Sequence, residues 1–248
     1  MDGLRSAGKV GSVHRRELED LYAEQNRLYL RERSIRMFNL VSSPGAGKTT
    51  LLARSIRDLK DQFTICVIEG DQQTSRDGER IASTGVQVVQ INTGKACHLD
   101  ARLVGRALEE LKLEKGGIVF VENVGNLVCP ADFDLGEDKR VVLLSVTEGD
   151  DKPLKYPNIF ASSDLMIVTK SDLLPYVDFD SGACIQYARR LKPAMETIET
   201  SARTGEGLRQ WYDWLSGRLL PRQSRGRGFC LRGALIRCPF SERGSRTL

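Results

Sequence analysis

The 248-residue sequence is poor in histidine, has no cysteine before Cys66 and contains no long apolar run. Without an apolar run of bilayer-spanning length, a transmembrane helix is not expected. The N-terminus carries charges throughout and lacks the apolar core of a signal peptide, so we expect a cytoplasmic protein without membrane insertion. The six cysteines lack the spacing of a disulfide framework, which favours a reducing compartment.

The net positive charge of the chain comes from its C-terminal tail. Residues 221–248 have seven arginines, no lysine and one glutamate, a net charge of +6 in a chain whose total is +4. Residues 1–220 therefore have a net charge of −2, and nucleic-acid binding is not expected of them. The tail lacks hydrophobic periodicity, so we expect it to be disordered, and its Cys230 and Cys238 have no other metal ligand beside them.

Residues 42–50, with the sequence SSPGAGKTT, have the pattern of a phosphate-binding loop. They follow an apolar run and precede helical spacing, the strand–loop–helix context that this motif requires. Glycines there let backbone N–H groups face a phosphate, and the new helix adds the positive end of its dipole. Ser42 replaces the usual first glycine, and a glycine-rich turn without a phosphate is the less favoured alternative. The residues expected to contact the nucleotide are Gly45, Ala46, Gly47, Lys48, Thr49 and Thr50.

Strand-like and helix-like segments alternate after residue 35. The expected strands are residues 37–41, 63–68, 86–91, 117–121, 141–146, 165–169 and 197–200. Expected helices follow the phosphate-binding loop and span residues 77–83, 99–113 and 207–219. This alternation predicts an α/β fold, a P-loop NTPase with a mostly parallel twisted sheet and helices on both faces. Ligands of such sheets collect at the carboxyl ends of the strands.

A helical pattern also precedes this domain. Residues 12–35 have helical spacing of apolar residues among many charges, and we expect a plain surface helix rather than one packed on the domain or on a partner. Residues 1–11 are expected to be disordered, and His14 to be solvated. The chain is thus divided into an N-terminal extension (residues 1–35), a P-loop domain (36–220) and an arginine-rich tail (221–248).

Two acidic residues follow expected strands at the edge of the sheet where the phosphates would lie. Asp71 follows the second strand, and Glu122 ends the strand at residues 118–121. Such carboxylates can hold Mg²⁺ with the hydroxyl of Thr49, or orient an attacking water, while Lys48 reaches the β- and γ-phosphates. Lys48, Asp71 and Glu122 are therefore the candidate catalytic residues, and Thr49, Asp71 and Glu122 the candidate Mg²⁺ ligands.

Residues 169–172, with the sequence TKSD, resemble the guanine-reading motif Asn-Lys-x-Asp of GTPases. Asp172 can accept hydrogen bonds from N1 and N2 of guanine, whereas adenine would leave the carboxylate unpaired. The stem of Lys170 can cover the base, and Thr169 replaces the usual asparagine, so it can brace the loop only in part. Ser201 and Ala202 resemble the segment whose backbone meets the guanine oxygen. GTP is therefore preferred over ATP.

Cys97, His98 and Cys129 are candidate metal ligands. Cys97 and His98 lie at the expected start of a helix, and Cys129 follows the strand of Glu122. Loops at one sheet edge could bring them together, and two thiolates with one imidazole suit Zn²⁺ or another borderline metal. On spacing alone, a buried thiol and a structural histidine are the commoner alternative.

Several longer segments resemble the hydrogenase nickel-incorporation GTPases, the HypB family. They are residues 68–73 (IEGDQQ), 90–94 (QINTG), 97–101 (CHLDA), 121–130 (VENVGNLVCP) and 145–157 (SVTEGDDKPLKYP). The resemblance covers roughly residues 36–218 and implies a SIMIBI-class GTPase that dimerises with GTP and helps to load nickel into nickel–iron hydrogenase. It implies GTP or GDP, Mg²⁺, and Ni²⁺ or Zn²⁺ as bound species. It implies a maturation partner protein and the hydrogenase large subunit as partners.

Carried over residue by residue, the resemblance gives Cys97, His98 and Cys129 the role of a metal site at a subunit interface. Lys152 or Lys155 could contact nucleotide across the dimer. The chain departs from relatives with a cysteine-rich or histidine-rich N-terminus, so tight nickel storage there is not expected. Two alternatives stay open, a metal-binding scaffold with vestigial GTPase activity and a urease-type nickel GTPase, whose ligands are usually joined as Cys-x-His.

Overall fold

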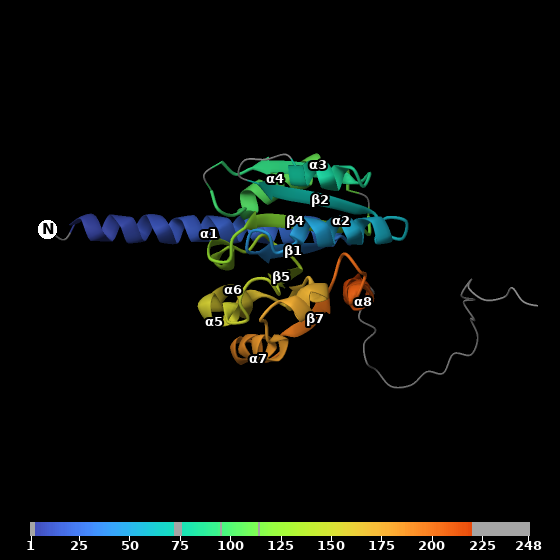
Figure 1. Cartoon of the computed structure of the whole chain (residues 1–248). Helices are drawn as coiled ribbons and strands as arrows, with labels where there is room; N and C mark the ends of the chain where they lie inside the picture. Colours follow the sequence, from blue (N-terminus) through green and yellow to red (C-terminus); the bar gives the residue numbers. More distant parts are fainter. Residues whose placement is uncertain (1–2, 72–75, 95, 114, 220–248) are drawn as a thin grey trace, which may run out of the picture.

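The computed structural model describes residues 3–71, 76–94, 96–113 and 115–219 (Figure 1). Side chains are described for all of these except residues 3–15, 71, 76, 218 and 219. Within these ranges, no helix has both the length and the apolar character needed to cross a membrane. The expected disorder of the arginine-rich tail, including Cys230 and Cys238, lies outside the described residues, as does the side chain of His14.

A seven-stranded parallel sheet forms the centre of the molecule. Its strands are β1 (Arg36–Ser42), β2 (Ile65–Asp71), β3 (Gln87–Asn92), β4 (Ile118–Gly125), β5 (Lys139–Ser145), β6 (Leu165–Thr169) and β7 (Glu196–Thr200). Their order across the sheet is β3-β2-β4-β1-β5-β6-β7, and every neighbouring pair is parallel. The predicted α/β fold with a parallel sheet is therefore confirmed.

Helices cover both faces of this sheet, as Figure 1 shows. The α-helices are α1 (Gly3–Glu32), α2 (Lys48–Leu59), α3 (Arg76–Ala82), α4 (Ala101–Glu110), α5 (Lys152–Lys155), α6 (Pro157–Ser162), α7 (Ser181–Leu191) and α8 (Leu208–Leu219). Two 3-10 helices, η1 (Cys129–Asp132) and η2 (Ser171–Tyr176), lie in loops. The sequence did not predict α5, α6 or α7.

The central strands β1, β4, β5 and β6 bury both of their faces, because alternate residues point to opposite sides of a sheet that helices cover on both sides. On β1, Phe38 and Leu40 join the cluster that includes Leu51, Leu52 and Ile56 of α2. Met37 joins the cluster on the other face, which includes residues of α1 and α4, and Val41 joins the cluster formed with α6 and α7. Such two-sided burial explains why these strands read as continuous apolar runs in the sequence.

Helix α1 differs from both expectations for the N-terminus. It begins at Gly3, so the expected disorder of residues 1–11 is wrong for the part that the structure describes. The segment lacks proline, and helix propagation from a packed end offsets the weak propensity of its glycines. The expectation of a plain surface helix is also wrong, because Ala23, Asn26 and Leu30 are buried against the domain. The N-terminal half of α1 extends beyond the body of the protein (Figure 1).

Two element boundaries differ from the sequence-based expectation in ways that matter for function. Strand β4 continues to Gly125, so Glu122 lies within the strand instead of at its end. Helix α4 begins only at Ala101, where Asp100 caps it by accepting a hydrogen bond from Leu103 N at 2.7 Å. Cys97 and His98 therefore lie in the loop before α4 and not at its start.

Candidate functional site

The phosphate-binding loop connects β1 to α2 at the carboxyl edge of the sheet. Gly45 and Gly47 have φ of +76° and +95°, in the left-handed region that glycine adopts without a steric cost. Gly47 precedes the first turn of α2, and its carbonyl accepts a hydrogen bond from Leu51 N at 2.9 Å. The loop therefore leads directly into a helix N-terminus, where backbone N–H groups and the helix dipole favour an anion.

Lys48 and Thr49 occupy the first positions of α2, and both are buried. The ammonium of Lys48 donates to Ser42 Oγ at 2.9 Å, so Ser42 has a contact that a glycine at this position could not make. The hydroxyl of Thr49 donates to Glu122 Oε1 at 2.6 Å. Three of the predicted catalytic and Mg²⁺-binding residues, Lys48, Thr49 and Glu122, therefore lie together.

Burial shifts the pKa of both charged groups in this cluster. It lowers the pKa of Lys48, against the opposing effect of the Glu122 charge. It raises the pKa of Glu122, against the opposing effects of the Lys48 charge and the Thr49 hydrogen bond. Glu122 Oε2 is buried and has no hydrogen-bond partner among the residues that the structure describes. A buried carboxylate oxygen without a donor, next to a threonine hydroxyl, fits the oxygen ligands that Mg²⁺ requires.

Asp71 is the last residue of β2, where it pairs in register with Asn92 of β3. In the same sheet, β2 pairs with β4 up to Glu69 and Glu122. The backbone of Asp71 therefore lies at the same edge as the phosphate-binding loop. Its side chain lies outside those that the structure describes, so its expected role in holding Mg²⁺ stays a prediction.

A cavity of about 220 Å³ opens beside the phosphate-binding loop. Six of its lining residues were predicted to contact the nucleotide, namely Gly47, Thr50, Thr169, Lys170, Asp172 and Ala202. Its other lining residues, Leu51, Leu173, Thr200 and Arg203, were not predicted. Arg203 directly follows Ser201 and Ala202, and this position could have suggested it. Leu51 and Leu173 are apolar and give no such signal.

Thr169 and Lys170 brace the phosphate-binding loop from β6. Thr169 Oγ1 donates to Ala46 O at 2.6 Å, and Lys170 Nζ donates to Gly45 O at 2.8 Å. Thr169 thus makes the bracing contact expected of the asparagine that it replaces. Lys170 has φ of +60°, a strained value for a residue other than glycine, which these contacts hold in place. Ser201 is fully buried and accepts a hydrogen bond from Thr204 N at 3.1 Å, so its side chain shapes the loop beside the cavity.

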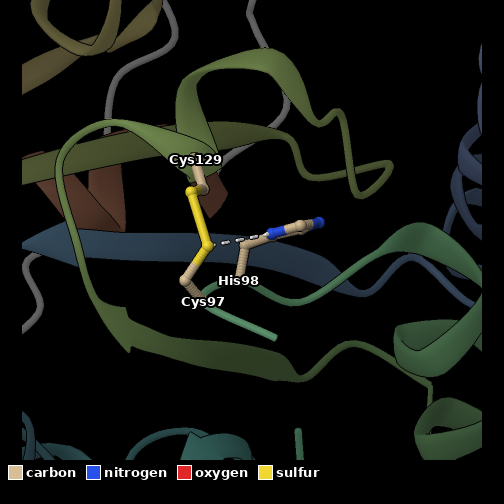
Figure 2. A group of neighbouring side chains, drawn as sticks. All are labelled: Cys97, His98 and Cys129. Carbon is tan, nitrogen blue, oxygen red and sulfur yellow. Dashed lines mark hydrogen bonds between the residues drawn. A yellow bond between two sulfur atoms is a disulfide. The ribbon is translucent and has the colours of Figure 1, made fainter. Parts of the chain in front are cut away.

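Cys97, His98 and Cys129 converge at the same edge, as Figure 2 shows. One potential ligand atom from each side chain lies within 4.8 Å of the other two, and all three residues are half-buried. The two cysteines form a disulfide in this structure, and Cys97 Sγ lies 3.8 Å from His98 Nδ1. The sequence did not predict this bond. A metal would need both sulfurs as free thiolates, and the donor set of two sulfurs and one imidazole then suits Zn²⁺ or Ni²⁺.

The imidazole of His98 is held by the loop that follows Cys129. It stacks on the ring of Phe133, with the centroids 3.8 Å apart and the planes at 25°. Burial lowers the pKa of His98, although Asp100 acts in the opposite direction. The histidine is therefore neutral at pH 7, the form in which a ring nitrogen can bind a metal.

The two other cysteines within the described ranges, Cys66 and Cys184, are free and buried. Burial raises the pKa of Cys66, and it raises the pKa of Cys184 to about 12. Both therefore stay protonated near neutral pH and behave as apolar core residues. They do not compete with Cys97 and Cys129 for a metal.

Two asparagines connect the strand of Glu122 to the loop of Cys97 and His98. Asn123 Oδ1 accepts a hydrogen bond from Leu99 N at 3.2 Å, and Asn126 Nδ2 donates to Cys97 O at 3.3 Å. The segment after β4 then carries Cys129 in η1. Glu122 and Cys129 therefore lie on one continuous segment, and two hydrogen bonds link this segment to the loop of Cys97 and His98.

The lysines that were expected to act across a dimer, Lys152 and Lys155, are the first and last residues of α5. Lys152 Nζ lies 3.2 Å from Glu148 Oε2 and 3.4 Å from Ser43 Oγ, so it contacts the phosphate-binding loop of its own chain. Lys155 is exposed and pairs with Asp151 at 2.7 Å. Contact across a dimer stays a prediction for both residues.

Comparison with known proteins places these features in one family. Residues 36–199 match the family described as CobW/HypB/UreG, nucleotide-binding domain. Hydrogenase maturation factor HypB of Rhizobium leguminosarum bv. viciae is 59% identical over 196 residues, which cover 79% of this chain and 66% of that protein. The chain thus spans just under two thirds of the length of this relative.

Solved structures agree with this assignment. The crystal structure of HypB from Helicobacter pylori in complex with nickel is 39% identical, with a TM-score of 0.77 over 81% of this chain and 94% of that one. The signal recognition particle 54 kDa protein of Aeropyrum pernix, in complex with GDP, is 16% identical, with a TM-score of 0.52 over 75% of this chain and 47% of that one. That likeness concerns the fold alone and agrees with the predicted SIMIBI-class architecture. The chain belongs to the HypB family of hydrogenase maturation factors.

Proposed function

We propose that this chain is a GTP-hydrolysing metallochaperone that assists nickel insertion during the maturation of nickel–iron hydrogenase in the cytoplasm. The observation that carries the proposal is the course of β4 and the segment after it. Glu122 accepts a hydrogen bond from Thr49 of the phosphate-binding loop. The segment that continues from Glu122 reaches Cys129, and its Asn126 donates a hydrogen bond to the backbone carbonyl of Cys97. A change at the nucleotide can therefore be transmitted to the metal ligands.

On the nucleotide side, the backbone N–H groups of residues 45–50 and the ammonium of Lys48 would hold the phosphates. Thr49, Asp71 and Glu122 would hold Mg²⁺, which neutralises charge that develops on the phosphates when it is bound. Asp71 or Glu122 would also orient the attacking water. Asp172 would accept hydrogen bonds from N1 and N2 of guanine in the cavity beside the loop, which favours GTP over ATP.

On the metal side, Cys97, Cys129 and His98 would bind nickel as a transported substrate. Three donors leave coordination positions open for a second subunit or for the protein that receives the metal. HypB from Helicobacter pylori was crystallised in complex with nickel, which supports Ni²⁺ as the cargo, and Zn²⁺ suits the same donors. The maturation partner protein and the hydrogenase large subunit are the proposed recipients.

The coupling is tested by the affinity for Ni²⁺ and Zn²⁺, measured on reduced protein with GDP and with a non-hydrolysable GTP analogue. We expect the affinity for at least one metal to differ between the two nucleotides, because Glu122 and the candidate metal ligand Cys129 lie on the same segment. Identical affinities for both metals would remove the coupling.

Replacing Lys48 with alanine separates hydrolysis from metal binding. We expect Lys48→Ala to abolish GTP turnover and to leave metal affinity in the presence of GDP largely unchanged, because Lys48 contacts Ser42 and not the metal loop. If Lys48→Ala protein still supports hydrogenase maturation in cells, the alternative of a scaffold with vestigial GTPase activity is favoured. The urease-type alternative is disfavoured by the adjacent Cys97 and His98 with a remote Cys129.

A further inference from the structure

Among the described side chains of helix α1 (residues 16–32), one polar residue, Asn26, is buried, at the point where the helix meets the loops of the proposed metal site. Only 5% of Asn26 is exposed. Its amide nitrogen donates two hydrogen bonds, to Ala101 O at 2.8 Å and to Leu135 O at 3.0 Å. These bonds use both hydrogens of the amide group. A single side chain thus joins two segments that are far apart in the sequence.

Both of these segments carry metal ligands. Ala101 is the first residue of α4, immediately after the loop of Cys97 and His98. Leu135 follows η1, which begins at Cys129, and the loop between them contains Phe133, on which His98 stacks. The amide of Asn26 therefore fixes the spacing between the Cys97–His98 loop and the Cys129 loop from the side of α1.

Two glycines allow α1 to approach this closely. A Cβ atom on Gly105 of α4 would lie 2.7 Å from Asn26 Oδ1. A Cβ atom on Gly136, next to Leu135, would lie 2.8 Å from Asn26 Cβ and would also meet Ala23 O. One glycine lies on each ligand-bearing segment, so any larger residue at either position would push α1 away from the metal loops.

Charged groups flank the amide and fasten the same two segments. Glu19 Oε2 accepts a hydrogen bond from Ala101 N at 3.2 Å. Arg27 donates to both carboxylate oxygens of Asp134, at 2.7 and 2.5 Å. Three residues of α1 thus hold the beginning of α4 and the loop after η1.

We propose that Asn26 is a positioning residue of the metal site, and that α1 sets the distance between its two ligand-bearing loops. This inference rests on the proposed function, because it assumes that Cys97, His98 and Cys129 bind nickel. Loss of the two hydrogen bonds lets the loops separate, so that the three ligands no longer converge on one ion. The N-terminal extension thereby becomes a structural part of the metal site.

The test is Ni²⁺ titration of reduced, GDP-bound full-length protein, followed by the sulfur-to-nickel charge-transfer absorbance. For Asn26→Ala we expect affinity to fall by about 10- to 100-fold, the usual effect of removing a group that orients metal ligands. We also expect an altered charge-transfer spectrum at saturating Ni²⁺, because one sulfur no longer reaches the ion. The spectrum reports ligand geometry, which a general loss of stability does not change.

Leu30→Ala is the matched control. Leu30 is buried on the same helix but packs in the apolar cluster with α4 and β1, so its truncation loosens α1 without removing the amide. A larger loss of affinity in Asn26→Ala than in Leu30→Ala, at comparable loss of thermal stability, supports the proposal. An unchanged affinity and spectrum in Asn26→Ala, or an equal or larger loss in Leu30→Ala, overturns it. Failure of the unaltered protein to bind Ni²⁺ would instead reject the proposed function.

Discussion

At the scale of single residues, metal chemistry at this site depends on the oxidation state of Cys97 and Cys129. The structure joins them in a disulfide, whereas metal binding requires two thiolates. We therefore expect Ni²⁺ binding only after a phosphine reductant has supplied two electrons to cleave the S–S bond. Nickel titration and thiol counting on the same oxidised and reduced samples measure this effect. The Ni²⁺ affinity of the Cys129→Ser variant should be weak under both oxidising and reducing conditions. Equal Ni²⁺ affinity of the oxidised and the reduced unaltered protein would contradict the prediction.

Asp172 decides the base preference if the cavity beside β6 holds guanine. Asp172→Asn replaces an acceptor with a donor, so we expect GDP binding to weaken by about 1.5–3 kcal/mol, roughly 10- to 150-fold. Xanthosine diphosphate, which carries a carbonyl where guanine has its amino group, should bind this variant better than the unaltered protein. Competition against a fluorescent nucleotide measures both affinities. Asp178→Asn, an exposed change outside the cavity, is the control and should leave both affinities unaltered.

Much of the site could be predicted from the sequence, because its residues belong to short motifs at strand ends. The phosphate-binding loop, residues 169–172 and the three candidate metal ligands were all singled out from the sequence, and the structure brings Cys97, His98 and Cys129 together. Asn26 could not be found in this way. Its importance comes from contacts with Ala101 and Leu135, which are remote in sequence, and a lone asparagine in a charged helix resembles any solvated residue.

At the scale of elements, the close packing of α1 against the domain depends on Gly136. It has φ of +84°, and an added Cβ would meet backbone atoms of α1. Gly136→Ala is expected to lower the free energy of unfolding by about 2–4 kcal/mol, from the left-handed backbone and from overpacking. Gly85→Ala is the matched control, because Gly85 has φ of +88° but nothing within 4 Å of an added Cβ. Gly85→Ala should lower the free energy of unfolding by only about 1–2 kcal/mol in the same urea titration. Similar losses in the two variants would contradict the predicted clash.

Asp164 connects the starts of β5 and β6. Its carboxylate accepts hydrogen bonds from Lys139 Nζ at 2.8 Å and Arg140 N at 3.0 Å. Burial alone would raise the pKa of Asp164, but these bonds and the charges of Lys139 and Lys192 outweigh it and lower the pKa. A lowered pKa stabilises the fold above the unfolded-state value of about 3.9, and this contribution is lost as the pH falls through the folded-state value.

Asp164→Asn should therefore destabilise the protein by about 1 kcal/mol at pH 7, a modest figure because the pair is partly exposed. The difference should shrink as the pH falls below about 4. Urea unfolding of both proteins across the pH range measures it. A difference that stays constant down to pH 2 would exclude the ionic origin.

The strands were predicted well because two-sided burial leaves short continuous apolar runs in the sequence. Some helices were missed because their buried and exposed faces differ little in hydrophobicity. In α7 the buried residues include Cys184 and Ala188, which are too small to mark an apolar stripe. The sequence did contain the end signals of this helix, an aspartate at its N-cap and two arginines in its last turn. In the structure, Asp180 accepts the capping hydrogen bond from Ala183 N at 2.9 Å. The burial of α1 was missed because it depends on α4 and the loop after η1, which no local pattern reveals.

At the scale of the whole molecule, we propose that a second copy fills coordination positions that three donors leave open in the proposed metal site. We expect the molar mass from light scattering to double with a non-hydrolysable GTP analogue and to stay monomeric with GDP. Lys48→Ala, which should lack productive γ-phosphate binding, should stay monomeric with both nucleotides. A mass that does not depend on the nucleotide would reject GTP-driven dimerisation, without bearing on the order of the strands.

The position of β1 at the middle of the sheet has a consequence for synthesis on the ribosome. Its neighbours β4 and β5 span residues 118–125 and 139–145, so β1 leaves the exit tunnel long before either can pair with it. During that interval the nascent chain displays a strand with the apolar residues Met37, Phe38, Leu40 and Val41 and with unsatisfied edges on both sides. The translation rate over residues 43–139, and the chaperones that reach the chain in that window, should therefore govern how much active protein a cell obtains.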